Sequence, residues 1–341
     1  MSLQICLVPK LDGLGGMVSF QAKFIQGLHS RRISTSFDLK HPKNTAVLVI
    51  GGTRHLWELW QAKQRGVRIV QRLNGLNWRH KVERLQLRRY LKAEINNQLI
   101  AFIRRFFPNT IVYQSEFSQT WWNRVFGPTT IPTQVTHNGI DLTQYSPDGS
   151  GKPPKDHLRL LLVEGHMSDG QTWGLETAVM LARSLKEIHD LSVELMVVGD
   201  VSDGVKAHAY TLAPQQWITW VGVVPRTQIP ALDRVAHVLF SADLNAACPN
   251  SVIEAMACGL PILAYETGAL KELVPETAGA VVPYGADYWQ LEKPRIEPLA
   301  QACVEIYQNN ADFRRGARAH AETHFGLDAM VESYLKALVP R

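Results

Sequence analysis

Short apolar runs alternate with longer amphipathic stretches along nearly the whole chain. The short runs are rich in β-branched residues and are expected to form strands, while stretches such as Leu175–Ile188 have the periodicity of helices. This alternation is typical of parallel sheets covered by helices on both faces, so the sequence predicts an α/β fold. The expected strands are Gln4–Val8, Ala46–Ile50, Val67–Arg72, Thr110–Gln114 and Gln134–Thr136 in the first half, and Leu158–Val163, Val193–Val198, Ile218–Val221, His237–Phe240, Pro261–Ala264 and Ala280–Val282 in the second.

One composition break divides the chain. The segment Ser146–Asp156, SPDGSGKPPKD, is rich in Pro, Gly and Ser, has no periodicity, and precedes a new apolar run. We therefore expect two Rossmann-like domains, residues 1–150 and 151–325, followed by a C-terminal helix in residues 326–341 that packs back toward the first domain. Open α/β sheets bind ligands at the carboxyl ends of their strands, so the site is expected there.

Composition narrows the class of protein. The chain has 341 residues, 45% hydrophobic and 20% charged, which is the profile of a globular protein with substantial cores. It has no apolar stretch of membrane-spanning length and no N-terminal signal-peptide pattern, so a cytoplasmic location is expected. The net charge of +5 favours anionic partners without choosing among them. Four cysteines form no metal-binding or redox motif and are expected to be reduced, structural thiols: Cys6, Cys248, Cys258 and Cys303.

The segment Phe240–Pro261, FSADLNAACPNSVIEAMACGLP, carries the most informative pattern. A strand leads into a loop, Asn250 or Ser251 is expected to cap the helix that follows, and Gly259 to end it. The N–H groups and the dipole of a helix N-terminus favour a phosphate group. Glu254 lies one turn into this helix, where it could reach a ribose hydroxyl or could simply complement the helix dipole in solvent.

The residues around Glu254 resemble the donor-binding motif of the retaining glycosyltransferases of family 4, the group 1 glycosyltransferases. Members of that family have the GT-B architecture, in which two Rossmann-like domains face each other across a cleft. The run Glu254–Pro261, EAMACGLP, matches the second half of the family motif. Further matching segments follow the family's order: GLGG at Gly13–Gly16, YQSEFS at Tyr113–Ser118, HNGIDLTQYSP at His137–Pro147, VVGD at Val197–Asp200, WVGVVPRTQIPAL at Trp220–Leu232, and ETGALKELV at Glu266–Val274.

The resemblance implies a binding site for a nucleotide diphosphate-sugar. Glu254 would hydrogen-bond the ribose, and the backbone N–H groups of Ser251, Val252 and Ala269 would hold the diphosphate. The segment Val221–Val224 would lie beside the base. Members of the family typically need no metal, so neither a metal nor a cofactor is expected. The residues expected to bind the donor are Gly15, Gly16, Gly165, Gly222, Val223, Asn250, Ser251, Val252, Glu254, Gly268 and Ala269.

One departure from the family pattern concerns the transferred sugar. The first glutamate of the family motif is associated with the sugar hydroxyls and with the charge that develops near the anomeric carbon. Ala246 stands at that position, and alanine can do neither. Asp243 and Asn245 lie in the same loop and could reach the sugar instead.

A second departure concerns the diphosphate. Family members usually carry an Arg and a Lys after the first strand of this domain, and Val163–Ala178 has neither. The polar residues nearest the expected points are His166, Gln171 and Thr172, so His166 is a candidate catalytic residue. Preorganised donors at a leaving group are worth about 3 to 4 kcal/mol each, so activity depends on what replaces them.

The first half has its own polar cluster. The segment Gln71–His80, QRLNGLNWRH, follows an expected strand and therefore lies at a carboxyl end, where an acceptor-orienting group belongs. Arg72 and Asn77 are candidate acceptor contacts, and Asn74 and His80 are candidate catalytic residues. A structural or solvated His80 is the competing interpretation.

The stretch Arg79–Phe107 is long, helical, basic and amphipathic. Such a helix suggests peripheral contact with an anionic membrane, on its inner face, or with a phosphorylated acceptor. A core-facing helix with a solvated basic face is the competing interpretation.

The favoured function is a metal-independent retaining glycosyltransferase acting in polysaccharide or glycoconjugate biosynthesis. It would move a sugar from a nucleotide diphosphate-sugar, UDP-sugar rather than GDP-sugar, to a saccharide, lipid or small-molecule acceptor. The alternative is a catalytically weak or inactive GT-B protein that binds nucleotide sugars, since Ala246 and the missing Arg/Lys pair remove family groups. An epimerase would require further acid–base residues, and no nucleic-acid partner is expected because no recognition module is present.

Overall fold

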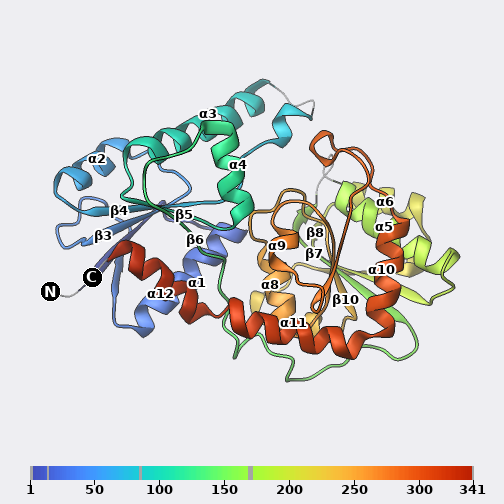
Figure 1. Ribbon diagram of the computed structural model, residues 1–341. Helices are drawn as coiled ribbons and strands as arrows, with labels where there is room; N and C mark the ends of the chain where they lie inside the picture. Colours follow the sequence, from blue (N-terminus) through green and yellow to red (C-terminus); the bar gives the residue numbers. More distant parts are fainter. Residues whose placement is uncertain (1–2, 14, 84–86, 168–171, 340–341) are drawn as a thin grey trace. The chain divides into compact units, whose positions relative to one another are not determined.

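The chain folds into two compact units. The computed structural model describes residues 3–13, 15–83, 87–167 and 172–339. The first unit comprises Met1–Gly139 and Leu327–Arg341, and the second comprises Ile140–Gly326. Each is built on a six-stranded sheet whose neighbouring strands are parallel (Figure 1). The predicted α/β class is confirmed.

The first unit is assembled from both ends of the chain. Its strands are β1 (Gln4–Val8), β2 (Ser34–Ser36), β3 (Ala46–Ile50), β4 (Arg68–Leu73), β5 (Thr110–Tyr113) and β6 (Thr133–Val135). Its helices are α1 (Gly16–Ser30), α2 (Leu56–Gln64), the 3-10 helix η1 (Arg79–Lys81), α3 (Leu87–Phe106), α4 (Glu116–Phe126) and α12 (Leu327–Leu338).

Successive side chains of a strand lie on opposite faces of its sheet, so the first unit has apolar core on both faces. Ile5 and Leu7 of β1 pack with α1 and α12, whereas Cys6 and Val8 pack with α2 and α3. Helix α12 is part of this core because Tyr334 lies against two rings of α1. Its ring centroid is 5.2 Å from that of Phe20 and 5.3 Å from that of Phe24.

The second unit repeats the alternation of strand and helix. Its strands are β7 (Leu158–Met167), β8 (Val193–Val201), β9 (Ile218–Gly222), β10 (Val238–Ser241), β11 (Ile262–Tyr265) and β12 (Gly279–Val282). Its helices are α5 (Trp173–Glu187), α6 (Asp203–Leu212), η2 (Gln215–Trp217), η3 (Arg226–Gln228), α7 (Ile229–Arg234), α8 (Asn250–Ala257), α9 (Leu270–Leu273), η4 (Tyr288–Gln290), α10 (Glu297–Gln308) and α11 (Asn310–His324).

Helices cover both faces of the second sheet. Helices α5, α6 and α10 share one apolar core with the strands, and α7, α8 and α11 pack together on the other face (Figure 1). Residues 140–150, which the sequence assigned to the first domain, pack here. The backbone N–H of Ile140 donates to the carbonyl of Phe325 at 2.8 Å, and Tyr145 is buried.

Strand order fixes where ligands can bind. The second sheet has the order β12-β11-β10-β7-β8-β9, so the chain reverses direction across the sheet between β7 and β10. The first sheet has the order β2-β1-β3-β4-β5-β6 and reverses between β1 and β3. A crevice opens at such a reversal outside the carboxyl ends of the strands, because the two connecting segments leave in opposite directions.

The expected strands correspond to eleven of the twelve observed ones. The missed strand, β2, is the three-residue edge segment Ser34–Ser36, whose polar sequence STS gives no apolar signal. The largest boundary difference is in β7, which continues past the apolar run Leu158–Val163 to Met167. In the described part of the chain, no helix combines the length and the apolarity needed to cross a bilayer. The cytoplasmic location stays a prediction.

Candidate functional site

Two carboxyl groups lie at the reversal point of the second sheet. Glu164 is near the end of β7 and Asp243 follows the end of β10, and these strands pair in parallel through Leu160–Val238 and Leu161–Leu239. Burial, followed by the charge of Asp243, raises the pKa of Glu164 to about 8. Burial also raises the pKa of Asp243. The raised pKa values favour protonation of these carboxyls, and a protonated carboxyl can donate a hydrogen bond as well as accept one.

Helix α8 begins directly after the loop that carries Asp243. Its N-cap is Pro249, and no side chain caps it, so the expected capping by Asn250 or Ser251 is wrong. Proline has no side-chain acceptor, and both polar residues are already in the first turn of the helix. The N-cap residue therefore offers no side-chain acceptor to the first N–H groups of α8, and helix N-termini of this kind can bind anions.

The C-terminal end of α8 is closed as the sequence predicts. Gly259 has φ +69°, its N–H donates to the carbonyl of Met256 at 2.9 Å, and the N–H of Leu260 donates to that of Ala255 at 2.8 Å. This pair of bonds with a left-handed residue is the Schellman motif. It stops the helix after Ala257 and fixes the position of its N-terminus relative to β10 and β11.

A second turn, between β11 and α9, is joined to the first loop by backbone contacts. Gly268 has φ +60°, and a Cβ there would lie 2.5 Å from the carbonyl oxygen of Ala246, so only glycine fits. The N–H of Ala269 donates to that same oxygen at 2.9 Å, and Thr267 Oγ1 donates to the carbonyl of Asp243 at 3.2 Å. The Ala269 amide, which was expected to face a phosphate, is thus used inside the protein.

Glu254 lies half-buried on α8 beside other titratable groups. Burial, followed by the charge of Glu254, raises the pKa of Asp233 well above its usual range. Burial and the same charge also raise the pKa of Tyr145. Asp233 is 1% exposed, and its Oδ2 atom makes no hydrogen bond within the described residues. The raised pKa of Asp233 favours its protonated, uncharged form beside Glu254.

The loop after β7 offers His166 in place of the missing cations. Its Nδ1 lies 2.8 Å from Asp200 Oδ2 at the end of β8, and both side chains are about 60% exposed. Gly165 beside it is also exposed. Thr172 Oγ1 donates to Glu176 at 2.5 Å, and Gln171 lies outside the described residues. His166 is therefore accessible and oriented by a carboxylate at the edge where ligands bind.

The end of β9 is open to solvent. Gly222 is its last residue and has φ +79°, and Val223 is 58% exposed. These residues thus lie at the carboxyl edge, where the sequence predicts the base.

In the first unit, Arg72 does not face an acceptor. Its side chain is completely buried, its guanidinium lies 3.8 Å from the ring centroid of Phe20, and Nη2 donates to Asn138 Oδ1 at 2.9 Å. The expected acceptor contact by Arg72 is therefore corrected: the guanidinium joins the end of β4 to the segment around Asn138.

Asn77 and His80 are engaged in structural contacts with α3. Asn77 Nδ2 donates to Asn97 Oδ1 at 3.0 Å, and Asn97 Nδ2 returns a bond to the Asn77 carbonyl at 2.8 Å. His80 is 4% exposed and its Nε2 lies 2.6 Å from Glu94 Oε1. The hydrogen bond from His80 is the largest cause that lowers the pKa of Glu94. These bonds favour the structural interpretation of His80.

Asn74 and the glycines after β1 are more open. The Asn74 carbonyl accepts from Trp122 Nε1 at 2.6 Å, while its side chain is half-buried at the end of β4. Gly15 is the N-cap of α1 with φ +123°, and a Cβ there would meet nothing within 4 Å. Gly15 and Gly16 are both exposed at the reversal point of the first sheet.

Sequence reasoning missed Glu164 and Asp233 as parts of the site. Glu164 follows an apolar run and matches no motif, and only the pairing of β7 with β10 brings it to Asp243. Asn245 was named, but its environment was not foreseen. It is 4% exposed with φ +57°, and neither polar atom of its amide has a partner within the described residues. The sequence signal for this environment was a polar residue, Asn245, among apolar residues in the loop after β10.

Residues 160–309 match the family model described as "Glycosyl transferases group 1". The match supports the group 1 glycosyltransferase family. A curated relative, D-inositol 3-phosphate glycosyltransferase from Mycobacterium avium, is 25% identical over 217 residues, which are 60% of this chain and 49% of the relative. The chain thus spans about half the length of that relative.

Solved structures agree with the architecture. Sucrose-phosphate synthase from Thermosynechococcus elongatus superposes with a TM-score of 0.73 at 14% identity, covering 97% of both chains. Anabaena HepE in complex with UDP superposes with a TM-score of 0.70 at 16% identity, covering 99% of both chains. WaaG, a glycosyltransferase involved in lipopolysaccharide biosynthesis, gives 0.70 at 15% identity over 99% of this chain and all of its own. The predicted GT-B fold is confirmed, and the predicted enzyme class agrees with the family match.

Proposed function

We propose that this protein is a retaining, metal-independent glycosyltransferase of family 4 that takes its sugar from a UDP-sugar. The observation that carries the proposal is the N-terminus of α8, capped by Pro249 without a side-chain acceptor and followed one turn later by Glu254, at the reversal point of the second sheet. The family match over residues 160–309 supports it. Anabaena HepE, which shares the fold, was solved in complex with UDP and with UDP-glucose, which supports a UDP-sugar.

The nucleotide would be held by groups of complementary charge. The N–H groups of Ser251 and Val252 lie in the first turn of α8 and would donate to the diphosphate together with the helix dipole. Glu254 would accept from the ribose hydroxyls, because it lies one turn into α8, next to the N–H groups that would hold the diphosphate. Gly222 and Val223 would lie beside the base.

The transferred sugar needs carboxylates that Ala246 does not provide. We assign that contact to Glu164 and Asp243, which the strand order brings to the same crevice. A proton held between them would let one carboxyl accept from a sugar hydroxyl while the other donates to it. Asn245, two residues after Asp243, adds an amide without a partner among the described residues.

Departure of the diphosphate requires neutralisation of its developing charge. The family's Arg and Lys are absent, so the N-terminus of α8 and the ring of His166 would share this task. Asp200 Oδ2, 2.8 Å from His166 Nδ1, would orient that ring. One preorganised donor at such a site contributes about a hundred- to thousandfold in rate.

The first test is a donor panel. Purified protein is incubated with UDP-sugars and GDP-sugars, and released nucleotide is measured beside calorimetric binding of UDP. We expect turnover with a UDP-sugar and about ten- to hundredfold weaker UDP binding in Glu254→Gln, since a hydrogen bond to a charged group is lost. Glu276→Gln, at an exposed carboxylate on the loop before β12, is the matched control and should bind as the parent does. The proposal would be refuted if no donor gave turnover and none bound.

The sugar contact is tested by comparing two ligands. In Asp243→Asn and Glu164→Gln, affinity for UDP-sugar should fall about tenfold while affinity for UDP stays the same, because only the sugar touches these carboxyls. Equal loss for both ligands would place the pair against the nucleotide and contradict the assignment.

The second candidate function is a nucleotide-sugar-binding protein without effective catalysis. Ala246 favours it, because the family glutamate is missing. Binding of a donor without turnover by the parent, and turnover by Ala246→Glu, would support this candidate. Turnover by the parent would exclude it.

The acceptor is proposed to be a saccharide, a lipid or a small molecule. Gly15, Gly16 and Asn74 remain candidate contacts at the carboxyl edge of the first sheet. Peripheral contact of α3 with an anionic membrane would favour a lipid acceptor.

A further inference from the structure

Helix α3 carries a row of exposed apolar side chains along its outer side. Leu87, Leu91, Ile95, Phe102 and Phe106 recur at helical spacing and are 72%, 47%, 65%, 45% and 55% exposed. The row runs from the first residue of the helix to the last. Five large exposed apolar side chains on one side of a helix are more typical of a binding face than of scattered surface residues.

Helix α3 is held to the sheet by a different side from the one that carries the apolar row. Asn97, Ile103 and Arg104 are buried, and Arg104 Nε donates to Tyr113 Oη at 2.9 Å. The helix is therefore anchored without using its apolar row. The competing interpretation, a core-facing helix with a solvated basic face, does not explain why that row is exposed.

Helix α2 lies beside α3 and adds two indoles. Lys63 Nζ donates to the carbonyl of Phe106 at 2.5 Å, which joins the C-terminal ends of the two helices. Trp57 and Trp60 are 63% and 43% exposed, and their rings stack with centroids 4.8 Å apart. Exposed tryptophans are characteristic of the boundary between a bilayer and water, where the apolar ring and the N–H both find favourable surroundings.

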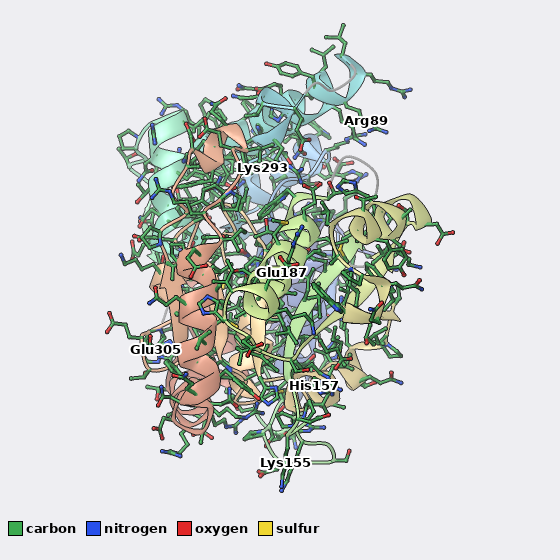
Figure 2. All side chains as sticks on the ribbon, turned by 90° about the vertical axis from the view of Figure 1, so that its right-hand side faces the viewer. Arg89, Lys155, His157, Glu187, Lys293 and Glu305 are labelled. Atoms are coloured by element: carbon green, nitrogen blue, oxygen red, sulfur yellow. The ribbon has the colours of Figure 1, made fainter. Side chains whose placement is uncertain are left out.

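A groove of about 870 Å³ opens between Arg54, in the loop before α2, and the first half of α3. Three cations line it, Arg54, Arg88 and Lys92, and none of them forms an ion pair within residues 3–339 as described. Arg89 on the same turn extends away from the protein (Figure 2). The single acid of α3, Glu94, is bonded to His80 and Lys81 instead. The apolar lining consists of Leu87, Leu91, Ile95 and Leu99.

We propose that this α2–α3 face, with its groove, docks on the surface of a membrane that contains anionic phospholipid. Phosphate headgroups would meet Arg54, Arg88 and Lys92, and acyl chains would cover the row from Leu87 to Phe106. These cations have no ion pair among the described residues and border exposed aliphatic and aromatic side chains, while Glu94, the acid of α3, is bonded to His80 and Lys81. Such a surface complements an anionic bilayer better than a protein surface of mixed charge. The inference does not rest on sugar transfer.

Vesicle co-sedimentation of the full chain tests this inference. The vesicles are phosphatidylcholine alone, and phosphatidylcholine with phosphatidylglycerol in equal parts, without nucleotide. We expect binding to the anionic vesicles, weaker binding as salt increases, and little binding to the neutral ones. The Arg88→Glu and Lys92→Glu variants should each weaken the partition coefficient at least about fivefold, since each cation near an anionic surface contributes that factor.

Matched variants distinguish binding through this face from nonspecific adsorption to vesicles. Ile95→Ser should weaken binding about tenfold, whereas Ile188→Ser should not, although Ile95 and Ile188 are 65% and 67% exposed. Lys155→Glu, at an exposed lysine of the linker (Figure 2), is the control for charge reversal and should leave binding unchanged. Quenching of Trp57 and Trp60 fluorescence by brominated phospholipid, lost in Trp57→Phe/Trp60→Phe, would support insertion of this face.

Three results would overturn the inference. These are no binding to anionic vesicles, binding that Ile95→Ser and Lys92→Glu leave intact, and self-association in the absence of lipid that Ile95→Ser abolishes. The last result would identify the face as an interface between copies of the chain. Because the assay contains no donor, its outcome is independent of the donor panel.

Discussion

Asp233 is the least exposed carboxyl group among the described residues. It is 1% exposed on α7, and burial together with the charge of Glu254 raises its pKa. A group that binds its proton more tightly in the folded state stabilises that state at low pH. This contribution is complete below the unfolded pKa, about 4 for Asp, and is lost as the pH rises toward the folded pKa. Glu164, with a pKa of about 8, acts in the same direction.

The free energy of unfolding should therefore decrease as the pH rises from about 4 to about 8. Asp233→Asn should flatten part of this decrease and raise stability at pH 8 by about 1 to 2 kcal/mol, because the amide carries no charge to desolvate. Urea unfolding measured across this pH range provides the check. Asp203→Asn, at a fully exposed carboxyl, is the control and should leave the profile unchanged. A profile that Asp233→Asn does not alter would contradict a raised pKa at this residue.

Both ends of helix α8 are set by particular residues, which fixes the position of the groups proposed to bind the nucleotide. Its length is set by Gly259, whose left-handed φ closes the Schellman motif, and its N-terminus is set by Pro249. A Cβ at Gly259 would also approach the carbonyl of Arg314 to 3.3 Å and Pro147 Cβ to 3.5 Å. Both strain and crowding therefore oppose any side chain at this position.

Gly259→Ala should cost about 1 to 2 kcal/mol of stability. Gly66→Ala is the matched control, because Gly66 follows α2 with φ +77° and a Cβ there would meet nothing within 4 Å. Thermal unfolding of both variants separates the backbone strain, common to the two, from crowding at Gly259. If the proposed role of α8 is right, Gly259→Ala also weakens UDP binding and Gly66→Ala does not. Equal stability of Gly259→Ala and the parent would argue against the strained closure.

At the scale of the whole molecule, the first unit depends on the last helix of the chain. Residues 327–341 belong to the unit formed by residues 1–139, so the chain enters that unit twice. Tyr334 is the largest fully buried side chain of α12, and its ring contacts both Phe20 and Phe24.

Tyr334→Ala should destabilise the first unit by about 3 to 5 kcal/mol, the usual cost of removing a buried aromatic ring. Lys336→Ala, an exposed residue of the same helix, is the control and should have little effect. Limited proteolysis that maps cleavage to residues 1–139 provides the measurement. UDP binding by the second unit should survive the substitution. Unchanged protease resistance of residues 1–139 would show that α12 is dispensable for this unit.

The sequence alone determined the α/β class, the order of strands and helices, and the motif at Glu254–Pro261. These features are local: apolar periodicity, Gly and Pro at chain reversals, and a contiguous run of matching residues lie within a few turns of each other. Capping of α8 was predicted wrongly because the first helical residue differs by one position from the N-cap, and residue preference alone does not fix that position.

Only the tertiary structure decided which side chains are accessible and which groups meet. Arg72 follows a strand as an acceptor contact would, but packing against Phe20 and Asn138 buries it. Glu164 and Asp243 are far apart in sequence and meet because β7 and β10 are neighbours at the reversal of strand order. Burial and pKa depend on every element packed around a group, and that sum exists only in the folded chain.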